Sequence, residues 1–325
     1  MIRIIDLNQN NSIVNFVVPV YNEKENINNF FLSLYSAIKY AKINEWRIYF
    51  ALHKSTDGSD VLLDRLGSKY TKNITVLKTN FLNKTASQKA AIKKIKNYGI
   101  IIFLDCDVRV DKRAIISIID KFKYNKSAVI LGGTVLPYKP KNVGFYKSII
   151  FYCLNITNIY SKILIPKYGS INPEGTKNYF HGRFFALRSK RYWIIKDERF
   201  PDDIILIDFI YQKFGINGTF YNLKNSKCYY QPYLSLRKHY FSHQKNYFFL
   251  KNLYIAYPSL SKFGYMYENT LNYKYLLKLP KSTLCFILIW MLISRVESLI
   301  YYFNYRINKQ NFDGMFLWEK MKSTK

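Results

Sequence analysis

The sequence predicts an α/β fold, with a mostly parallel sheet flanked by helices and a helical, aromatic C-terminal tail. Two observations carry this prediction. Apolar runs of strand length alternate along the N-terminal half with stretches whose apolar residues recur at helical spacing. The strand-length runs are also nearly continuous, which is typical of parallel strands covered on both faces. In such sheets, ligands bind just beyond the carboxyl ends of the strands.

The first strand and helix are the clearest elements. Residues 13–20 form an almost unbroken apolar run that ends at Tyr21, Asn22 and Glu23. Apolar side chains then recur every three or four residues, which predicts a helix with one buried face. These side chains are Ile27, Phe30, Phe31, Leu34, Ile38 and Ala41. Further strands are expected at residues 46–52, 74–77, 99–104 and 128–136, and further helices at residues 61–66, 84–97 and 114–122.

The second half is less regular. Its expected elements are a helix at 143–165, a polar loop at 171–175, a strand at 179–187, a helix at 204–214 closed by Gly215, and a strand at 219–223. No repeat or low-complexity linker interrupts the chain. We therefore expect one domain over residues 1–232, followed by a helical region over residues 233–325.

The composition indicates which classes of binding partner to expect. With 50 basic and 21 acidic residues, the net charge is +29. Such an excess suggests an anionic membrane or a phosphate-bearing ligand, although a genome rich in A/T codons would supply many of the same residues. Nucleic acid is the least favoured partner, because the basic residues are spread out and accompany no recognition motif. The four scattered cysteines favour a reducing compartment.

The most informative stretch is the pair of carboxylates at Asp105 and Asp107. They follow directly after the apolar strand expected at residues 99–104. Hard oxygen ligands of this kind suit Mg²⁺ or Mn²⁺ bridging a diphosphate. Taken alone, the pair would also fit a strand that ends in solvated Asp residues. The surrounding motifs decide between this interpretation and a metal site.

Five segments in chain order give that context. They are residues 17–23 (VVPVYNE), 55–59 (STDGS), 105–107 (DCD), 181–188 (HGRFFALR) and 200–203 (FPDD). With these segments, the chain resembles the family 2 glycosyltransferases of the GT-A fold, from about residue 13 to residue 243. The resemblance implies an inverting transferase that moves a sugar from a nucleotide-sugar donor to a glycan or lipid-linked acceptor. It also implies a donor half at residues 1–138 and an acceptor half at residues 139–232.

The resemblance assigns chemical roles to four carboxylates. Asp107 would coordinate Mg²⁺ or Mn²⁺, and Asp105 would contact the ribose or a metal-bound water. Asp203 would be the general base that deprotonates the acceptor hydroxyl. Asp202 stays open as the base, since Asp202 and Asp203 also suit a helix N-terminus and capping needs only one of them.

Other residues of the matching segments are assigned to substrates. The donor-binding set comprises Pro19, Tyr21, Glu23, His53, Asp57, Lys84 and Arg237, in addition to Asp105 and Asp107. The acceptor-binding set comprises His181, Gly182 and Arg183. One departure concerns the donor base, because Leu52, His53 and Lys54 stand where the family has acidic residues. Three alternatives stay open: His53 recognises the base, Asp57 takes over this function, or the loop serves a nucleotide other than uridine.

The tail suggests contact with a membrane. Residues 284–293 form an apolar run of only ten residues, interrupted soon after by Arg295 and Glu297. A span needs about 20 apolar residues. We therefore expect a peripheral helix on the cytoplasmic face of an anionic membrane, with a helix in the protein core as the alternative. The spacing of His239 and His243 matches a metal site, but no Glu follows His239, so zinc is not favoured.

Two other functions remain open. The altered loop at residues 52–54 would fit a non-catalytic binding protein that kept the fold. A sugar nucleotidyltransferase is the second alternative, although it would normally carry a Gly-rich phosphate loop near the N-terminus. The expected function is a cytoplasmic glycosyltransferase in cell-surface polysaccharide synthesis.

Overall fold

The structure is a computed structural model of the whole chain. It describes residues 13–80, 83–96, 99–138, 143–159, 181–195, 202–214, 219–232, 234–240 and 281–307. The predicted loop at 171–175, Gly215 and His243 lie outside the described residues. The chain divides into two compact units. One unit combines Met1–Val135 with Tyr168–Tyr230, and the other combines Leu136–Lys167 with Gln231–Lys325. The domain scheme expected from the sequence, with a boundary at residue 232, stays a prediction.

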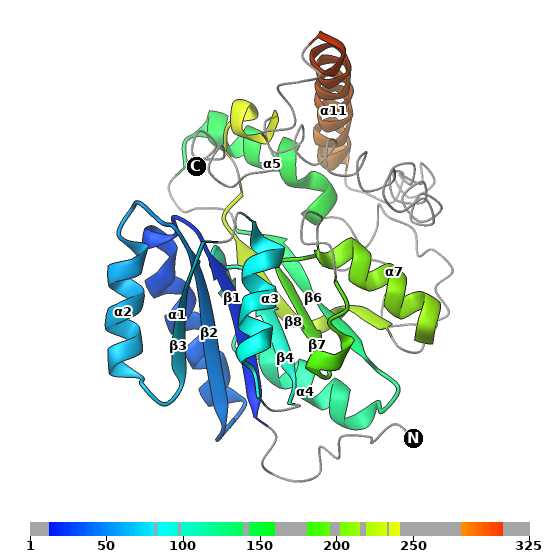
Figure 1. Cartoon of the computed structure of the whole chain (residues 1–325). Helices are drawn as coiled ribbons and strands as arrows, with labels where there is room; N and C mark the ends of the chain where they lie inside the picture. The colour runs from blue at the N-terminus through cyan, green and yellow to red at the C-terminus, as the bar shows by residue number, and fades with distance from the viewer. Residues whose placement is uncertain are drawn as a thin grey trace. The chain divides into compact units, whose positions relative to one another are not determined.

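The first unit is built on a single mixed sheet with the strand order β3-β2-β1-β4-β7-β6-β8-β5 (Figure 1). Its strands are β1 (Val14–Val20), β2 (Trp46–His53), β3 (Ile74–Thr79), β4 (Ile101–Leu104), β5 (Val108–Val110), β6 (Ile130–Pro137), β7 (Phe184–Leu187) and β8 (Thr219–Tyr230). The expected α/β fold is confirmed.

Half of this sheet is parallel and half is not. β3, β2, β1 and β4 pair in parallel, as expected from the alternation of strands and helices. β4 pairs antiparallel with β7, β7 with β6, and β5 with β8. The three-residue strand β5 was not predicted from the sequence. It begins directly after Asp107, so the two carboxylates lie in the turn that joins β4 to β5.

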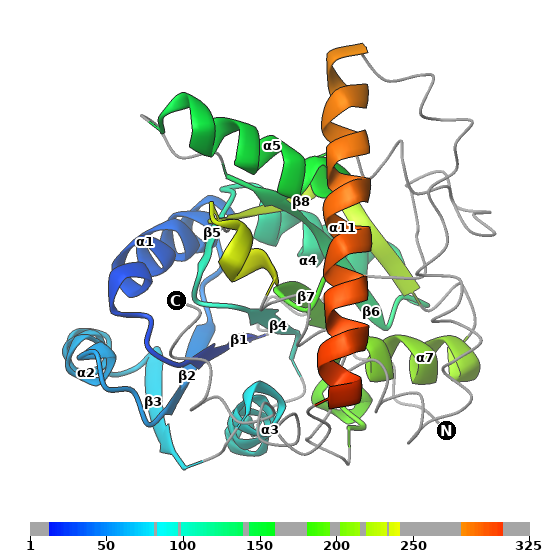
Figure 2. The ribbon, with the colours of Figure 1, turned by 90° about the horizontal axis from the view of Figure 1, so that it is seen from above.

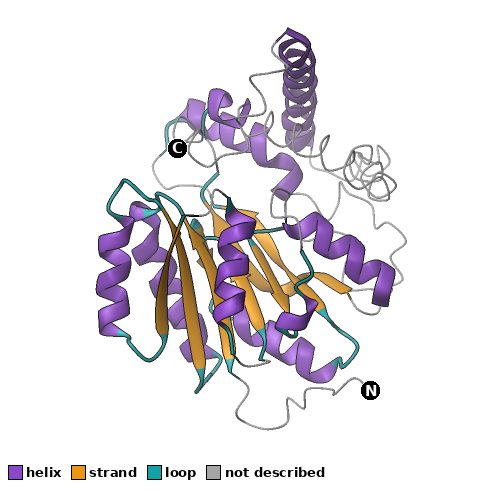
Figure 3. Cartoon of the chain, in the orientation of Figure 1, coloured by secondary structure: helices purple, strands orange, loops and turns teal. Residues whose placement is uncertain are grey.

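Helices cover both faces of this sheet (Figures 2 and 3). On one face, α1 (Lys24–Tyr40), α2 (Ser59–Lys69) and α4 (Ala114–Tyr124) share a hydrophobic core with Phe16, Val18 and Val20 of β1. On the other face, α3 (Lys84–Lys94) and α7 (Asp202–Phe214) pack with Val17 of the same strand. Since successive side chains of a strand point to opposite faces, an unbroken apolar run is what two covered faces require.

The second unit contains two long helices that pack together, α5 (Phe145–Ile159) and α11 (Lys281–Ile307). Tyr152 of α5 and Phe286 of α11 have their ring centroids 5.4 Å apart. A short helical stretch covers residues 236–240. Its His239 is buried and lies with Nδ1 2.9 Å from Oε1 of Glu297 on α11.

The length of α11 corrects one expectation. The apolar run at residues 284–293 was judged too short to span a membrane, because Arg295 and Glu297 follow it. In the structure the run continues without a break into a helix of 27 residues. By length and composition alone, Thr283–Ile300 is long and apolar enough to cross a membrane. The two charged residues do not interrupt the helix: Arg295 is exposed to solvent and Glu297 is buried.

Candidate active site

Two loops meet at the carboxyl ends of β1 and β2, in the segments expected to bind the donor. The backbone N–H of Asn22 donates to Ser55 Oγ (3.0 Å), and the N–H of Thr56 donates to Asn22 Oδ1 (2.8 Å). The N–H of Glu23 donates to Ser59 Oγ (2.9 Å). Asn22 adopts a positive φ of 53°, which Asn tolerates better than most residues. These bonds fix the two motif segments against each other.

Asp57 has a structural function in this hydrogen-bond network. Its Oδ2 accepts from the backbone N–H of Lys24 (2.9 Å), the first residue of α1. Its Oδ1 accepts from the backbone N–H (3.0 Å) and the hydroxyl (2.6 Å) of Ser59, the first residue of α2. Burial acts to raise the pKa of Asp57, but these hydrogen bonds outweigh it and lower the pKa. Base recognition by Asp57 stays a prediction.

His53 and Tyr21 lie side by side at the ends of β2 and β1. Their ring centroids are 5.1 Å apart, and both side chains are buried. Pro19 precedes Tyr21 within β1 and pairs with Ala51 of β2. Its missing N–H costs the pairing with β4 nothing, because that pairing ends at Val17. The predicted donor-binding residues Pro19, Tyr21 and His53 therefore lie together at the carboxyl ends of β1 and β2.

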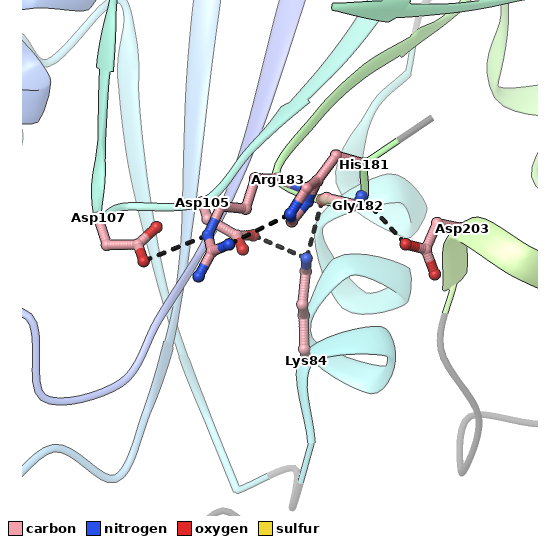
Figure 4. A network of polar contacts seen from close by, with 7 residues as sticks. All are labelled: Lys84, Asp105, Asp107, His181, Gly182, Arg183 and Asp203. Carbon is pink, nitrogen blue, oxygen red and sulfur yellow. Dashed lines mark hydrogen bonds and ion pairs between the residues drawn. The ribbon is translucent and has the colours of Figure 1, made fainter. Parts of the chain in front are cut away.

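Asp105 and Asp107 each contact a basic side chain (Figure 4). Lys84 Nζ lies 2.7 Å from Asp105 Oδ1, and Arg183 Nε lies 3.4 Å from Asp107 Oδ2. Burial raises the pKa of the Asp105 carboxyl; the Lys84 ammonium opposes that shift, and the Asp107 charge adds to it. The four side chains are between 23% and 29% exposed, so both ion pairs are partly shielded from solvent.

The backbone of Gly182 joins the donor side to the acceptor side (Figure 4). Its carbonyl accepts a hydrogen bond from Lys84 Nζ (2.9 Å), and its N–H donates to Asp203 Oδ2 (3.0 Å). The backbone N–H of Asp105 also donates to the Arg183 carbonyl (3.1 Å). The predicted metal ligands, the predicted general base and the predicted acceptor segment thus form one connected network.

His181 is neutral in this environment. Burial, together with the charges of Arg183 and Lys84, holds the pKa of His181 well below its ordinary value. Its Nε2 lies 3.2 Å from Arg183 Nη1, and its Nδ1 lies 3.3 Å from the Arg183 backbone N. A neutral imidazole accepts at only one ring nitrogen, so one of these contacts is a hydrogen bond at any time.

Tyr230 was missed from the sequence. The Arg183 guanidinium lies over its ring, 4.4 Å from the centroid, which holds the guanidinium beside Asp107. The strand expected at residues 219–223 continues in the structure to Tyr230 and pairs there with Val108 of β5. The polar run from Lys224 to Lys227 hid this extension. A signal was available in the aromatic pair Tyr229 and Tyr230, since aromatic residues favour strands.

Three of the remaining residues have other positions. Glu23 precedes α1 and accepts a hydrogen bond at Oε2 from Asn26 Nδ2 (2.6 Å). Asp202 is the first residue of α7. Arg237 is an exposed residue of the second unit. Their parts in donor binding and catalysis stay predictions.

The comparisons with known proteins identify the family of the chain. A sequence model described as "Glycosyl transferase family 2" matches residues 15–193, which is more than half of the 325 residues. No match was found among curated proteins.

Similar solved structures were also found, and the first of these supports the fold. The mannosyltransferase PcManGT from Pyrobaculum calidifontis, solved in complex with GDP-Man and Mn²⁺, is 12% identical with a TM-score of 0.52. The match covers 93% of this chain and 82% of that one. Glucosyl-3-phosphoglycerate synthase from Mycobacterium tuberculosis is 11% identical with a TM-score of 0.45, over 70% of this chain and 74% of that one. The family match decides between a transferase and the two alternative functions. The chain belongs to glycosyl transferase family 2 and is a nucleotide-sugar glycosyltransferase of the GT-A fold.

Proposed function

We propose that this glycosyltransferase moves a sugar, with inversion, from a nucleoside diphosphate sugar to a hydroxyl of a glycan or lipid-linked acceptor in cell-surface polysaccharide synthesis. One observation carries the proposal. The Asp105 and Asp107 pair on the donor side and Asp203 on the acceptor side are linked through the backbone of one residue, Gly182. A single displacement needs these two sides close together, since the base and the leaving group act on one sugar.

The carboxylates fit a divalent ion. Among the described residues, no group of three or more His, Cys, Asp or Glu side chains could hold a metal by itself. Mg²⁺ is commonly bound by one or two carboxylates together with substrate phosphates, which is the set that Asp105 and Asp107 offer. Asp107 would hold Mg²⁺ or Mn²⁺, with Asp105 on the ribose or on a metal-bound water. When bound, the ion neutralises the charge that builds on the departing diphosphate.

Asp203 is the proposed general base. The hydrogen bond from the Gly182 N–H fixes one carboxylate oxygen, which orients the group relative to the segment of His181, Gly182 and Arg183. From this position the carboxylate takes the proton of the acceptor hydroxyl as that hydroxyl attacks the anomeric carbon. Asp202, the neighbouring first residue of α7, is the second candidate for the same step.

A donor screen tests this function. Nucleoside diphosphate sugars with different bases and sugars are each incubated with the full chain and Mn²⁺, and hydrolysis and thermal stabilisation are measured. At least one donor is expected to raise the melting temperature, and chelation with EDTA is expected to abolish that shift. Equal stabilisation with and without a divalent ion would contradict the metal site. No response to any donor would contradict the donor assignment.

We also propose that the second unit attaches the enzyme to the cytoplasmic face of an anionic membrane. Large apolar side chains of α11 are exposed along one side of the helix: Leu288, Ile289, Leu292, Val296, Leu299, Ile300 and Phe303. The opposite side, with Thr283, Ile287 and Glu297, is buried. A helix with one side packed and the other apolar and exposed suits a position in the interface plane, and the net charge of +29 favours anionic lipids.

Vesicle flotation distinguishes attachment from spanning. Peripheral attachment predicts binding to vesicles that contain phosphatidylglycerol, weak binding to pure phosphatidylcholine, and release by high salt. Equal flotation with both vesicles and resistance to salt would indicate a spanning helix. Absence of flotation with either vesicle would place the exposed side of α11 against protein.

A further inference from the structure

Lys84 and Arg183 hold the positions beside the proposed metal ligands that counter-ions would take. Lys84 Nζ is 2.7 Å from Asp105 Oδ1, and Arg183 Nε is 3.4 Å from Asp107 Oδ2 (Figure 4). Two carboxylates and two cations make a site without net charge. A divalent ion added to it would introduce two uncompensated positive charges next to an ammonium and a guanidinium.

Each of the two cations makes a second contact besides the one to its carboxylate. Lys84 is the first residue of α3 and reaches Asp105 with its flexible side chain, while donating also to the Gly182 carbonyl (2.9 Å). Arg183 lies on the Tyr230 ring and reaches Asp107 over a longer distance. Lys84 therefore makes the shorter contact with its carboxylate, and Arg183 makes the longer one.

We propose that Lys84 and Arg183 are resident counter-cations of Asp105 and Asp107, which a divalent ion must displace from the carboxylates when the donor binds. This inference rests on the proposed function, since it assumes the metal site of that proposal. It gives each of the two carboxylates a positively charged partner while no metal ion is bound. The diphosphate that accompanies the ion restores the charge balance and accepts the displaced cations.

The exchange has a consequence on the acceptor side. When Lys84 leaves Asp105, the hydrogen bond from Lys84 to the Gly182 carbonyl is weakened as well. The backbone N–H of the same residue, Gly182, donates to Asp203 Oδ2, so the orientation of the base is linked through this residue to occupancy of the donor site. Donor binding before acceptor binding is the order that this linkage favours.

Binding of Mn²⁺ alone tests the displacement. The full chain is titrated with Mn²⁺ in the absence of nucleotide, and free Mn²⁺ is measured by electron paramagnetic resonance. Lys84→Met removes the ammonium and is expected to bind Mn²⁺ about tenfold more tightly than the wild type. The magnitude follows from proton affinity, because one adjacent opposite charge changes a carboxylate pKa by about 1–3 units. Arg183→Gln is expected to have a smaller effect of the same sign.

Matched variants separate this effect from net charge. Lys94→Met removes an exposed ammonium from the other end of α3, and Arg47→Gln removes an exposed guanidinium from β2. Both are expected to bind Mn²⁺ like the wild type. Lys84→Arg keeps the charge and is expected to keep the weak affinity. If Lys84→Met does not fold, Arg183→Gln carries the test, because it removes the other counter-cation.

The two ways of failing can be told apart. If Lys84→Met and Arg183→Gln bind Mn²⁺ no more tightly than the controls, the counter-cation proposal is wrong. Absence of measurable Mn²⁺ binding in every variant has the same meaning, since the exposed carboxylates should then bind the ion. If instead Asp107→Asn retains metal-dependent binding of a nucleoside diphosphate, the metal site of the proposed function is itself wrong.

Discussion

Asp203 is the residue on which the proposed chemistry most depends. A lost general base removes proton transfer in the transition state and typically costs a factor of about 10² to 10⁴ in rate. Asp203→Asn is therefore expected to bind metal and nucleotide nearly as the wild type does and to transfer little sugar. Asp107→Asn is expected to lose donor affinity as well, because it removes a metal ligand. Calorimetry with the donor and a transfer assay, at matched melting temperatures, measure both effects.

The neighbouring carboxylate provides the control. If Asp202 is the base, Asp202→Asn loses the activity, and Asp203→Asn stays active because its amide oxygen can still accept the Gly182 N–H. Near-normal turnover in both variants would show that neither carboxylate takes the proton. The reaction would then need a base from outside α7.

Asp57 gives a prediction about pH. Its pKa in the folded protein is lowered, so its ionised form stabilises the fold at a pH above the unfolded value of about 3.9. That contribution is lost as the pH falls through the lower, folded pKa. Asp57→Asn is expected to be less stable at neutral pH by about 1 kcal/mol, as for other lost helix caps. Below about pH 4 its melting temperature is expected to approach that of the wild type.

Asp60 is the matched control for this measurement. It lies three residues further along the chain, in the first turn of α2, and is expected to share the favourable position near the helix N-terminus without joining α1 to α2. Asp60→Asn should keep the acid dependence of the wild type. An Asp57→Asn protein whose melting temperature falls in parallel with the wild type between pH 7 and pH 3 would rule out this role of Asp57.

At the scale of elements, the packing of β6 on β7 depends on a missing side chain. A Cβ at Gly133 would overlap the ring of Phe184, which is fully buried in β7. Gly133→Ala is expected to destabilise the protein by about 1–3 kcal/mol, because an overpacked core must shift a ring or a strand. Chemical denaturation measures the loss.

Gly67 of α2 is a control with the opposite sign. An added Cβ there would make only ordinary contact with Val76, at 3.5 Å from Cγ2. Gly67→Ala is expected to stabilise the helix by about 0.5–1 kcal/mol, since alanine is the better helix former. Equal effects of the two substitutions on stability would show that the Phe184 ring can move aside without a loss of stability.

The buried pair of His239 and Glu297 ties two elements of the second unit together. Removing one partner leaves the other polar group buried, which costs about 1–3 kcal/mol. Glu297→Ala and His239→Ala are each expected to lower the stability by this amount, and the double variant by clearly less than their sum. A double-mutant cycle measured by denaturation gives the coupling. Additive losses would mean that the 2.9 Å contact does not stabilise the unit.

The sequence predicted the elements that obey a simple periodicity. β1, α1 and β4 were found because their apolar residues repeat at the spacing of strands and helices, and the carboxylates after β4 were found by position. β5 is too short for any period to show. The roles of Lys84 and Tyr230 depend on contacts across about 98 and 47 residues of chain, which no local pattern encodes.

The continuity of α11 was missed for a related reason. A count of consecutive apolar residues stops at Arg295, whereas a helix distributes residues over its surface and can bury Glu297 on one side while Leu299 stays exposed on another. His239, which pairs with that glutamate, lies 58 residues away in the sequence. The partner that makes a charge acceptable in such a helix was therefore invisible to a window of neighbouring residues.

At the scale of the whole molecule, the two units are not consecutive pieces of chain. Each is assembled from two separated segments, so the polypeptide passes between them three times. Cutting the chain after Tyr230 would keep all the strands of the sheet but separate α5 from its packing partner α11. Such a truncated protein is expected to aggregate more than the full chain, because buried Phe151 and Leu154 of α5 lose cover. Light scattering of both proteins at equal concentration measures this, and a monodisperse truncated protein would contradict it.

The interleaving of the two units also determines the order in which α5 and α11 are synthesised. α5 leaves the ribosome long before α11, which begins about 120 residues later, and translation proceeds at roughly 5–20 residues per second. For roughly 6 to 24 seconds at these rates, the nascent chain carries a helix whose eventual neighbour does not yet exist. The order of segments along the gene thus leaves α5 without its packing partner until almost the whole chain has been made.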